Sequence, residues 1–122
     1  MDGPFACPCC GYRTLDEAYG CYEICPICFW EDDPVQLHNP VLAGGANRVS
    51  LVEAQLSFAQ HGTSELRLAG HVRRPGPADV RDPGWRPVDP ARDLPGTSGA
   101  MSNMNYFHAS AATYGSPYWM QP

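Results

Sequence analysis

The chain has 122 residues, enough for one ordinary domain, and its 13 prolines and 12 glycines exclude helix and central strand from much of it. Residues 1–33 contain seven acidic residues and one arginine, a formal charge of −6, which argues against nucleic acid as a partner. The first residues lack the apolar run of a signal peptide, and no segment is long enough for a membrane span. We therefore expect a cytoplasmic protein.

All six cysteines lie in one stretch, CPCCGYRTLDEAYGCYEICPIC, at residues 7–28. Aligning CPCCGY (7–12) with CPICFW (25–30) reveals a repeat of Cys-Pro-x-Cys, one further residue and an aromatic residue. Each such turn lets two thiolates converge on one metal, and its proline fixes φ. In a reducing compartment, clustered cysteines indicate metal ligands rather than disulfides. We predict one structural Zn²⁺ held by Cys7, Cys10, Cys25 and Cys28.

Alternatives to this site remain open. A rubredoxin-type iron site would use the same four cysteines, and two disulfides would need no metal. Cys9 occupies the x position of the first turn, so we expect a bystander near the metal, with a redox-sensitive thiol or a substitute ligand as alternatives. Cys21 has no counterpart in the repeat, and its simplest role is a small apolar residue in the second hairpin. Gly11 suits a left-handed backbone after the first turn.

A four-thiolate zinc site has no open coordination position for hydrolytic chemistry. The sequence also has no nucleophile elbow, phosphate loop or H-E-x-x-H pattern. We therefore expect that the protein is not an enzyme.

The second turn runs into FWEDD, which puts Phe29 and Trp30 beside three acidic residues at 31–33. Aromatic anchors rimmed by charge are common in protein interfaces, so both are candidate partner-binding residues. The alternative is that the two aromatic side chains cover the metal and meet a helix while the three carboxylates are solvated.

The segment RVSLVEAQLSFAQHG predicts one helix at about residues 50–61. Ser50 and Glu53 form a capping-box pattern, and Gly62 is well placed to end the helix. We expect the helix to pack on the metal-bound hairpins through an apolar face made of Leu51, Val52, Ala54, Leu56, Phe58 and Ala59.

From Arg73 onward, closely spaced prolines predict extended, turn-rich backbone. The last section, residues 97–122, has no charged side chain and five aromatic residues, a composition unlike that of a free disordered chain. We predict that this tail docks on a partner or on its own chain, with a non-functional extension as the alternative. Its candidate anchors are Tyr106, Phe107, Tyr118 and Trp119.

The motifs CPCCGYRTL, YEICPICFWEDDPVQ and GANRVSLVEAQLSFAQHG together resemble the bacterial cysteine-rich CPCC domain family, over about residues 7–75. The resemblance implies a small zinc-ribbon-like domain and supplies no activity. By this resemblance, Cys9 and the four predicted ligands correspond to cysteines of the family. Cys21 has no counterpart there and is an addition in this chain.

These observations predict an α+β fold in which residues 1–75 form a zinc-ribbon-like domain, with two Cys-Pro-x-Cys knuckles on short β-hairpins and one packed helix. Residues 76–122 would then be a proline-rich and aromatic extension. The expected function is a non-enzymatic, zinc-binding protein-interaction or accessory subunit of a larger bacterial assembly. A nucleic-acid-associated zinc ribbon is the first alternative, and a thiol redox sensor using Cys9 is the second.

Overall fold

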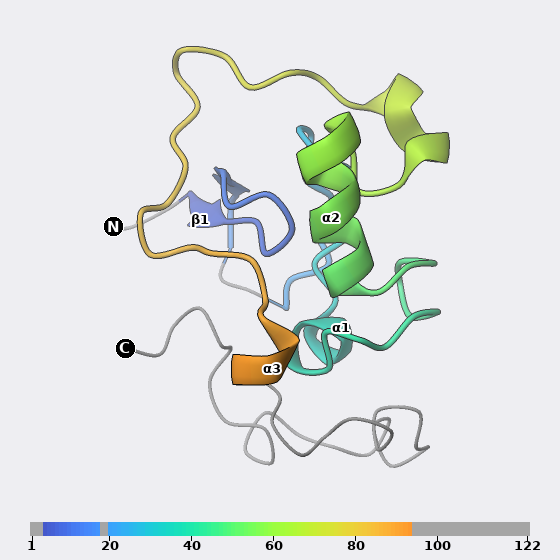
Figure 1. The fold of residues 1–122 in the computed structure, drawn as a ribbon. Helices are drawn as coiled ribbons and strands as arrows, with labels where there is room; N and C mark the ends of the chain where they lie inside the picture. Colours follow the sequence, from blue (N-terminus) through green and yellow to red (C-terminus); the bar gives the residue numbers. More distant parts are fainter. Residues whose placement is uncertain (1–3, 18–19, 94–122) are drawn as a thin grey trace.

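The computed structural model describes residues 4–17 and 20–93 (Figure 1). The predicted anchors of the tail, Tyr106, Phe107, Tyr118 and Trp119, lie outside the described residues. The elements are β1 (Phe5–Ala6), β2 (Arg13–Leu15), α1 (Pro34–His38), α2 (Leu51–His61), a 3₁₀ helix η1 (Leu66–His71) and α3 (Pro90–Asp93). Among these residues, no helix has the length and apolar character needed to cross a membrane.

The two strands form one antiparallel hairpin around the first Cys-Pro-x-Cys turn. Phe5 pairs with Leu15 and Ala6 with Arg13, with an irregularity between Phe5 and Ala6. The second turn is flanked by a single bridge between Ile24 and Glu31 instead of a full hairpin. The predicted mixed α/β fold is thus confirmed in outline, although residues 4–17 and 20–93 contain one two-stranded hairpin where two were expected.

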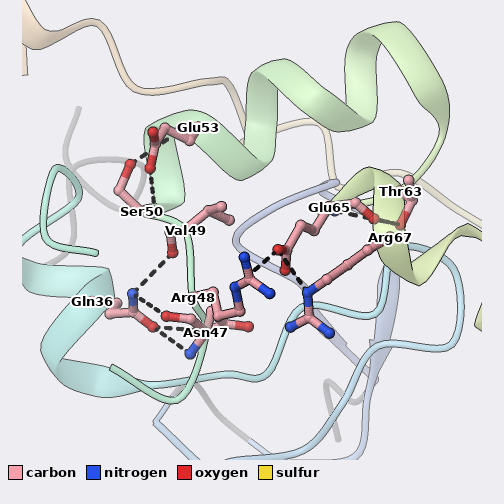
Figure 2. Close-up of polar contacts among 9 residues, drawn as sticks. All are labelled: Gln36, Asn47, Arg48, Val49, Ser50, Glu53, Thr63, Glu65 and Arg67. Atoms are coloured by element: carbon pink, nitrogen blue, oxygen red, sulfur yellow. Dashed lines mark hydrogen bonds and ion pairs between the residues drawn. The ribbon is translucent and has the colours of Figure 1, made fainter. Parts of the chain in front are cut away.

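The predicted helix is α2, and its ends are those that the sequence indicates. Ser50 is the N-cap: its Oγ accepts from Glu53 N at 3.1 Å, while Glu53 Oε1 accepts from Ser50 N at 2.8 Å (Figure 2). Gly62 ends the helix with a left-handed φ of 75°. Leu51 and Ala54 are buried as expected, but Leu56 is 60% exposed. It lies five positions after Leu51, about 140° around the helix axis and off the buried face.

Two of the acidic residues after the second turn are buried, which contradicts the alternative in which all three carboxylates are solvated. Asp32 is fully buried, and its Oδ2 accepts from the backbone N–H groups of Gly20 and Cys21 at 2.6 and 3.1 Å. Asp33 is the N-cap of α1, and its carboxylate accepts from Val35 N at 2.8 Å and from Ala46 N at 2.9 Å. Both carboxylates therefore satisfy backbone donors, as buried polar groups must.

A buried amide network joins α1 to the loop before α2. Gln36 shares its side-chain N–H donors among the carbonyls of Leu42, Asn47 and Val49 at 2.9–3.2 Å, and its Oε1 accepts from Asn47 N and Nδ2 (Figure 2). Asn47 in turn bonds both backbone groups of Glu31, at 2.9 and 2.8 Å. The network therefore fixes the chain just after the second cysteine turn.

The core is built around the cysteine turns. Leu15, Ile27, Trp30, Leu37 and Leu51 are each at most 1% exposed, and they cluster with Cys7, Cys9, Cys10, Cys25 and Cys28. Such a core is small, so the cysteine cluster forms a large share of the interior.

Residues 80–88, which we call the strap, cross the first cysteine turn and contain a turn of their own at residues 83–84. Arg13 N donates to Val80 O at 2.9 Å, Asp82 N donates to Gly11 O at 2.8 Å, and Val88 N donates to Gln55 Oε1 at 2.9 Å. In Figure 1 this orange part of the chain runs close beside the blue β1 hairpin. The proline-rich section predicted to be extended therefore packs against the residues of the cysteine-rich section.

Candidate metal centre

The two Cys-Pro-x-Cys turns have the same backbone hydrogen bonds at aligned positions. In the first knuckle (residues 7–12), Cys7 N donates to Tyr12 O at 2.9 Å and Gly11 N donates to Cys7 O at 2.8 Å. In the second knuckle (residues 25–30), Cys25 N donates to Trp30 O at 2.9 Å, and Phe29 N donates to Cys25 O at 2.8 Å. The sequence repeat is therefore also a structural repeat.

Both knuckles turn through a left-handed residue after the second cysteine. Gly11 has φ 80°, as its place in the sequence predicts, and the aligned Phe29 has φ 69°. A left-handed backbone costs a residue with a side chain about 1–2 kcal/mol. The Phe29 ring lies tilted against His71, with centroids 5.2 Å apart, so this residue combines a strained backbone with a ring contact.

The structure brings the four predicted ligands together. The Sγ atoms of Cys7, Cys10, Cys25 and Cys28 all lie within 4.8 Å of one another, and all four residues are fully buried. The shortest separations join the two knuckles: Cys7 to Cys28 at 3.5 Å and Cys10 to Cys25 at 3.8 Å. Four sulfurs around a tetrahedral zinc are separated by about 3.8 Å, given Zn–S bonds of about 2.3 Å. The cluster is therefore able to hold a metal ion of that size.

Two further groups donate to the sulfurs. Thr14 Oγ1 donates to Cys25 Sγ at 3.1 Å, and Trp30 N donates to Cys28 Sγ at 3.5 Å. Donors of this kind stabilise thiolate charge and orient metal ligands. Thr14 follows the first knuckle on β2 and reaches across to the second, so no local signal in the sequence indicates this role.

The thiols differ in proton affinity. Burial raises the pKa of Cys7 and Cys28, whereas hydrogen bonds from Cys10, Cys28, Cys7 and Thr14 lower the pKa of Cys25. Because a cysteine must lose its proton to bind a metal, metal affinity rises with pH.

The two remaining cysteines, Cys9 and Cys21, lie outside this group. Cys9 is fully buried, and burial raises its pKa. Cys21 is partly exposed; its Sγ donates to Asp32 Oδ2 at 3.2 Å, and burial and this carboxylate raise its pKa to about 12. None of the six cysteines forms a disulfide in the structure.

The predicted partner-binding residues of the second knuckle have different positions. Phe29 is half-buried against His71, whereas Trp30 is 1% exposed and lies in the core. The expectation that Trp30 contacts a partner is therefore corrected, because its side chain fills the space beside the cysteines and leaves almost no surface.

Sequence reasoning missed two residues of the strap. Trp85 Nε1 donates to Pro8 O at 2.8 Å, and Arg81 Nε donates to Cys10 O at 2.8 Å. The Arg81 guanidinium also lies over the rings of Tyr12 and Trp85, 5.2 and 4.6 Å from their centroids. The one available signal was a tryptophan in an otherwise polar, proline-rich segment.

Comparison with known proteins agrees with the cysteine motifs of the sequence. The model of the family described as "Cysteine-rich CPCC" matches residues 5–79, which is more than half of the chain and includes both knuckles and α2. None of the curated proteins compared with the chain matches it. The strap lies just beyond the matched residues. On this match, the chain belongs to the cysteine-rich CPCC family.

Proposed function

We propose that the protein binds one structural zinc ion and acts without catalysis as a protein-interaction or accessory subunit. The observation that carries the proposal is the group of four buried Sγ atoms from Cys7, Cys10, Cys25 and Cys28, all within 4.8 Å of one another. Zinc is the preferred metal because it accepts four thiolates in tetrahedral geometry and has no redox chemistry.

Complete coordination supports the non-enzymatic part of the proposal. With four cysteines bound, zinc keeps no position for water or substrate, so its effect is to connect the two knuckles. Since the sulfurs lie in the centre of a small core, much of the folding free energy would come from metal binding.

Charge supports a protein partner over nucleic acid. Residues 1–33 carry a formal charge of −6, and four thiolates with one divalent ion add −2. Among the residues that the structure describes, five arginines form ion pairs with carboxylates, which reduces their capacity to bind phosphates. These are Arg13, Arg48, Arg67, Arg73 and Arg86.

Exposed apolar side chains beside the second knuckle also support a protein partner. Tyr22 is 52% exposed and Ile24 is 47% exposed, and both precede the knuckle on the segment that pairs with Glu31 and Asp32. Aromatic and aliphatic groups next to acidic residues are typical of interface surfaces.

A thiol redox sensor has less support. Reactive thiols need a thiolate in an accessible position. Cys9 is buried with a raised pKa, and the pKa of Cys21 is about 12, so neither cysteine outside the cluster has those properties.

The test combines metal analysis with partner capture from the protein's own host. We expect one zinc per chain, and a partner retained by tagged wild type and by Cys9→Ser but released when Cys25→Ser removes the metal. Retention on a nucleic-acid column that falls steeply with salt would instead favour the nucleic-acid alternative. Capture that is unchanged in Cys25→Ser would contradict a role for the metal-bound fold.

A further inference from the structure

We propose that the strap is a second part of the metal centre, in which Arg81 and Trp85 are positioning residues that slow the loss of metal from the first knuckle. This inference rests on the proposed binding of zinc. It adds residues beyond the part of the chain that matches the family, which ends at residue 79.

The strap supplies hydrogen-bond donors to the carbonyls of the first knuckle. Pro8 O accepts from Trp85 Nε1 at 2.8 Å and from Gln55 Nε2 at 3.0 Å. Cys10 O accepts from Arg81 Nε at 2.8 Å, and the next carbonyl, that of Gly11, accepts from the backbone of the strap. Pro8 lies between the two ligands of this knuckle, and Gly11 directly follows Cys10. Donors to these carbonyls and to that of Cys10 therefore fix the orientation of both ligands.

The strap also packs closely against the first knuckle. A Cβ atom built on Gly11 would lie 2.5 Å from Trp85 Cδ2, so the indole ring lies directly against the backbone that follows Cys10. This contact leaves no room for water or a chelating molecule at that point. An incoming ligand must displace Trp85 before it can approach the knuckle from this side.

The charge of the strap complements that of a loaded site. A zinc ion with four thiolates carries a net charge of −2, and the Arg81 guanidinium is attached to the knuckle through Cys10 O. The rings of Tyr12 and Trp85 hold that guanidinium in a cation–π arrangement. The cation therefore complements the negative charge of the metal-bound knuckle.

The carbonyls of the second knuckle accept hydrogen bonds from backbone groups instead of from side chains. There, Cys28 O accepts from Ser64 N at 2.7 Å and Pro26 O accepts from Arg73 N at 3.1 Å, both backbone donors. The positions equivalent to these carbonyls in the first knuckle are Cys10 and Pro8, which are bound by side chains. Side-chain donors can release a carbonyl by a rotamer change, so we expect metal to leave through the first knuckle.

The experiment measures zinc transfer from the loaded full-length protein to an excess of chromophoric chelator. We expect Trp85→Ala and Arg81→Ala to release zinc at least ten times faster than wild type, with one zinc per chain still bound at the start. Trp85→Phe, which keeps a ring but loses the Nε1 donor, and Arg81→Lys, which keeps the charge but loses the planar group, should give smaller increases. They also keep the test decisive if the alanine variants fold poorly. Arg48→Ala, which removes a 70%-exposed arginine ion-paired with Glu65, is the matched control.

A second readout locates the effect. During release, alkylation by iodoacetamide is followed for each cysteine by peptide mass spectrometry. We expect Cys7 and Cys10 to react faster in the strap variants, with little change at Cys25 and Cys28 in the early phase. A general loss of stability would accelerate both knuckles alike.

Two outcomes would count against the role of the strap, and they are distinguishable. A wild-type chain that binds no zinc contradicts the proposed function, and this inference with it. A zinc-loaded wild type whose strap variants release metal within twofold of its rate, or react equally at both knuckles, overturns the inference alone.

Discussion

The first knuckle is covered mainly by side chains from distant parts of the sequence, whereas the second is covered by backbone groups and a buried amide network. Trp85, Arg81 and Gln55 bond the carbonyls of the first knuckle. Ser64 N and Arg73 N bond those of the second, and Asn47 holds the residue that follows it. Both knuckles nevertheless have the same internal hydrogen bonds.

This difference shows that one part of the sequence determines the geometry of a cysteine turn and other parts determine what surrounds it. Ligand geometry follows from Cys-Pro-x-Cys and a left-handed residue, and it is repeated at both sites. The surrounding groups differ because each knuckle meets a different part of the chain. Substitutions in the ligands should therefore act equally on the two knuckles, while substitutions around them should not.

Ligand substitutions should have the largest effect. Structural zinc contributes on the order of 10 kcal/mol to folding in small domains. We expect Cys10→Ser in the first knuckle and Cys25→Ser in the second to lose both zinc and folded structure, as measured by elemental analysis and circular dichroism. Cys9→Ser should keep both. If it lost zinc as completely as Cys10→Ser, the assignment of ligands would be wrong.

The next largest effect is expected at Gly11. Gly11→Ala places a Cβ atom against Trp85 in a left-handed backbone, which should lower the free energy of unfolding by about 3–4 kcal/mol. Gly62→Ala is the control, because Gly62 has φ 75° but no atom within 4 Å of the position that a Cβ would take, so about 1–2 kcal/mol is expected there. Chemical denaturation of the zinc-loaded proteins measures both values.

The aligned residue of the second knuckle sharpens this test. Phe29→Gly relieves the left-handed backbone but loses the ring contact with His71, so the two effects should nearly cancel, to within about 1 kcal/mol. Equal losses of stability for Gly11→Ala and Phe29→Gly would contradict the difference in surroundings between the two knuckles.

A smaller effect, about 2–3 kcal/mol, is expected for Gln36→Ala, which leaves several buried carbonyls without a donor. Because Gln36 supports Asn47, and Asn47 bonds Glu31, the damage should concentrate at the second knuckle. Hydrogen exchange should become faster at Glu31 N but not at Cys7 N. The exposed Gln60→Ala on α2 serves as control, and equal acceleration at both knuckles would argue against separate supports.

The smallest effect concerns the ion pair between Arg73, whose backbone N–H bonds the second knuckle, and Asp79, the residue just before the strap. Arg73 bonds Asp79 through both guanidinium nitrogens, at 2.7 and 3.0 Å, and lowers the pKa of that carboxyl from 3.8 to about 2. Since the folded-state pKa is the lower one, the pair stabilises the fold above pH 3.8, and this contribution is lost as pH falls toward 2. The pair is exposed, so the gain is slight. An NMR titration should show the pKa of Asp79 rising in Arg73→Ala; an unchanged value would contradict the pairing.

What could be predicted from the sequence was local or repeated. Ser50 and Glu53 determine the start of α2, and Gly62 determines its end. The two Cys-Pro-x-Cys turns are recognised by aligning them with each other. Gly11 was predicted to be left-handed because glycine adopts that conformation at no steric cost.

What could not be predicted depends on contacts between distant residues. Trp85 and Arg81 reach the first knuckle across 77 and 71 residues, and nothing in RDPGWRP (81–87) indicates that destination. The burial of Asp32 and Asp33 was missed for the same reason, because a run of three acids favours solvent unless other segments supply donors. Those donors come from backbone N–H groups at Gly20, Cys21 and Ala46.

The four-cysteine zinc site is tested by X-ray absorption at the zinc edge, together with elemental analysis of protein purified without added metal. We expect one zinc per chain and a first shell of four sulfurs at about 2.3 Å. A folded chain without stoichiometric metal, or a first shell containing nitrogen or oxygen, would contradict a site made of Cys7, Cys10, Cys25 and Cys28.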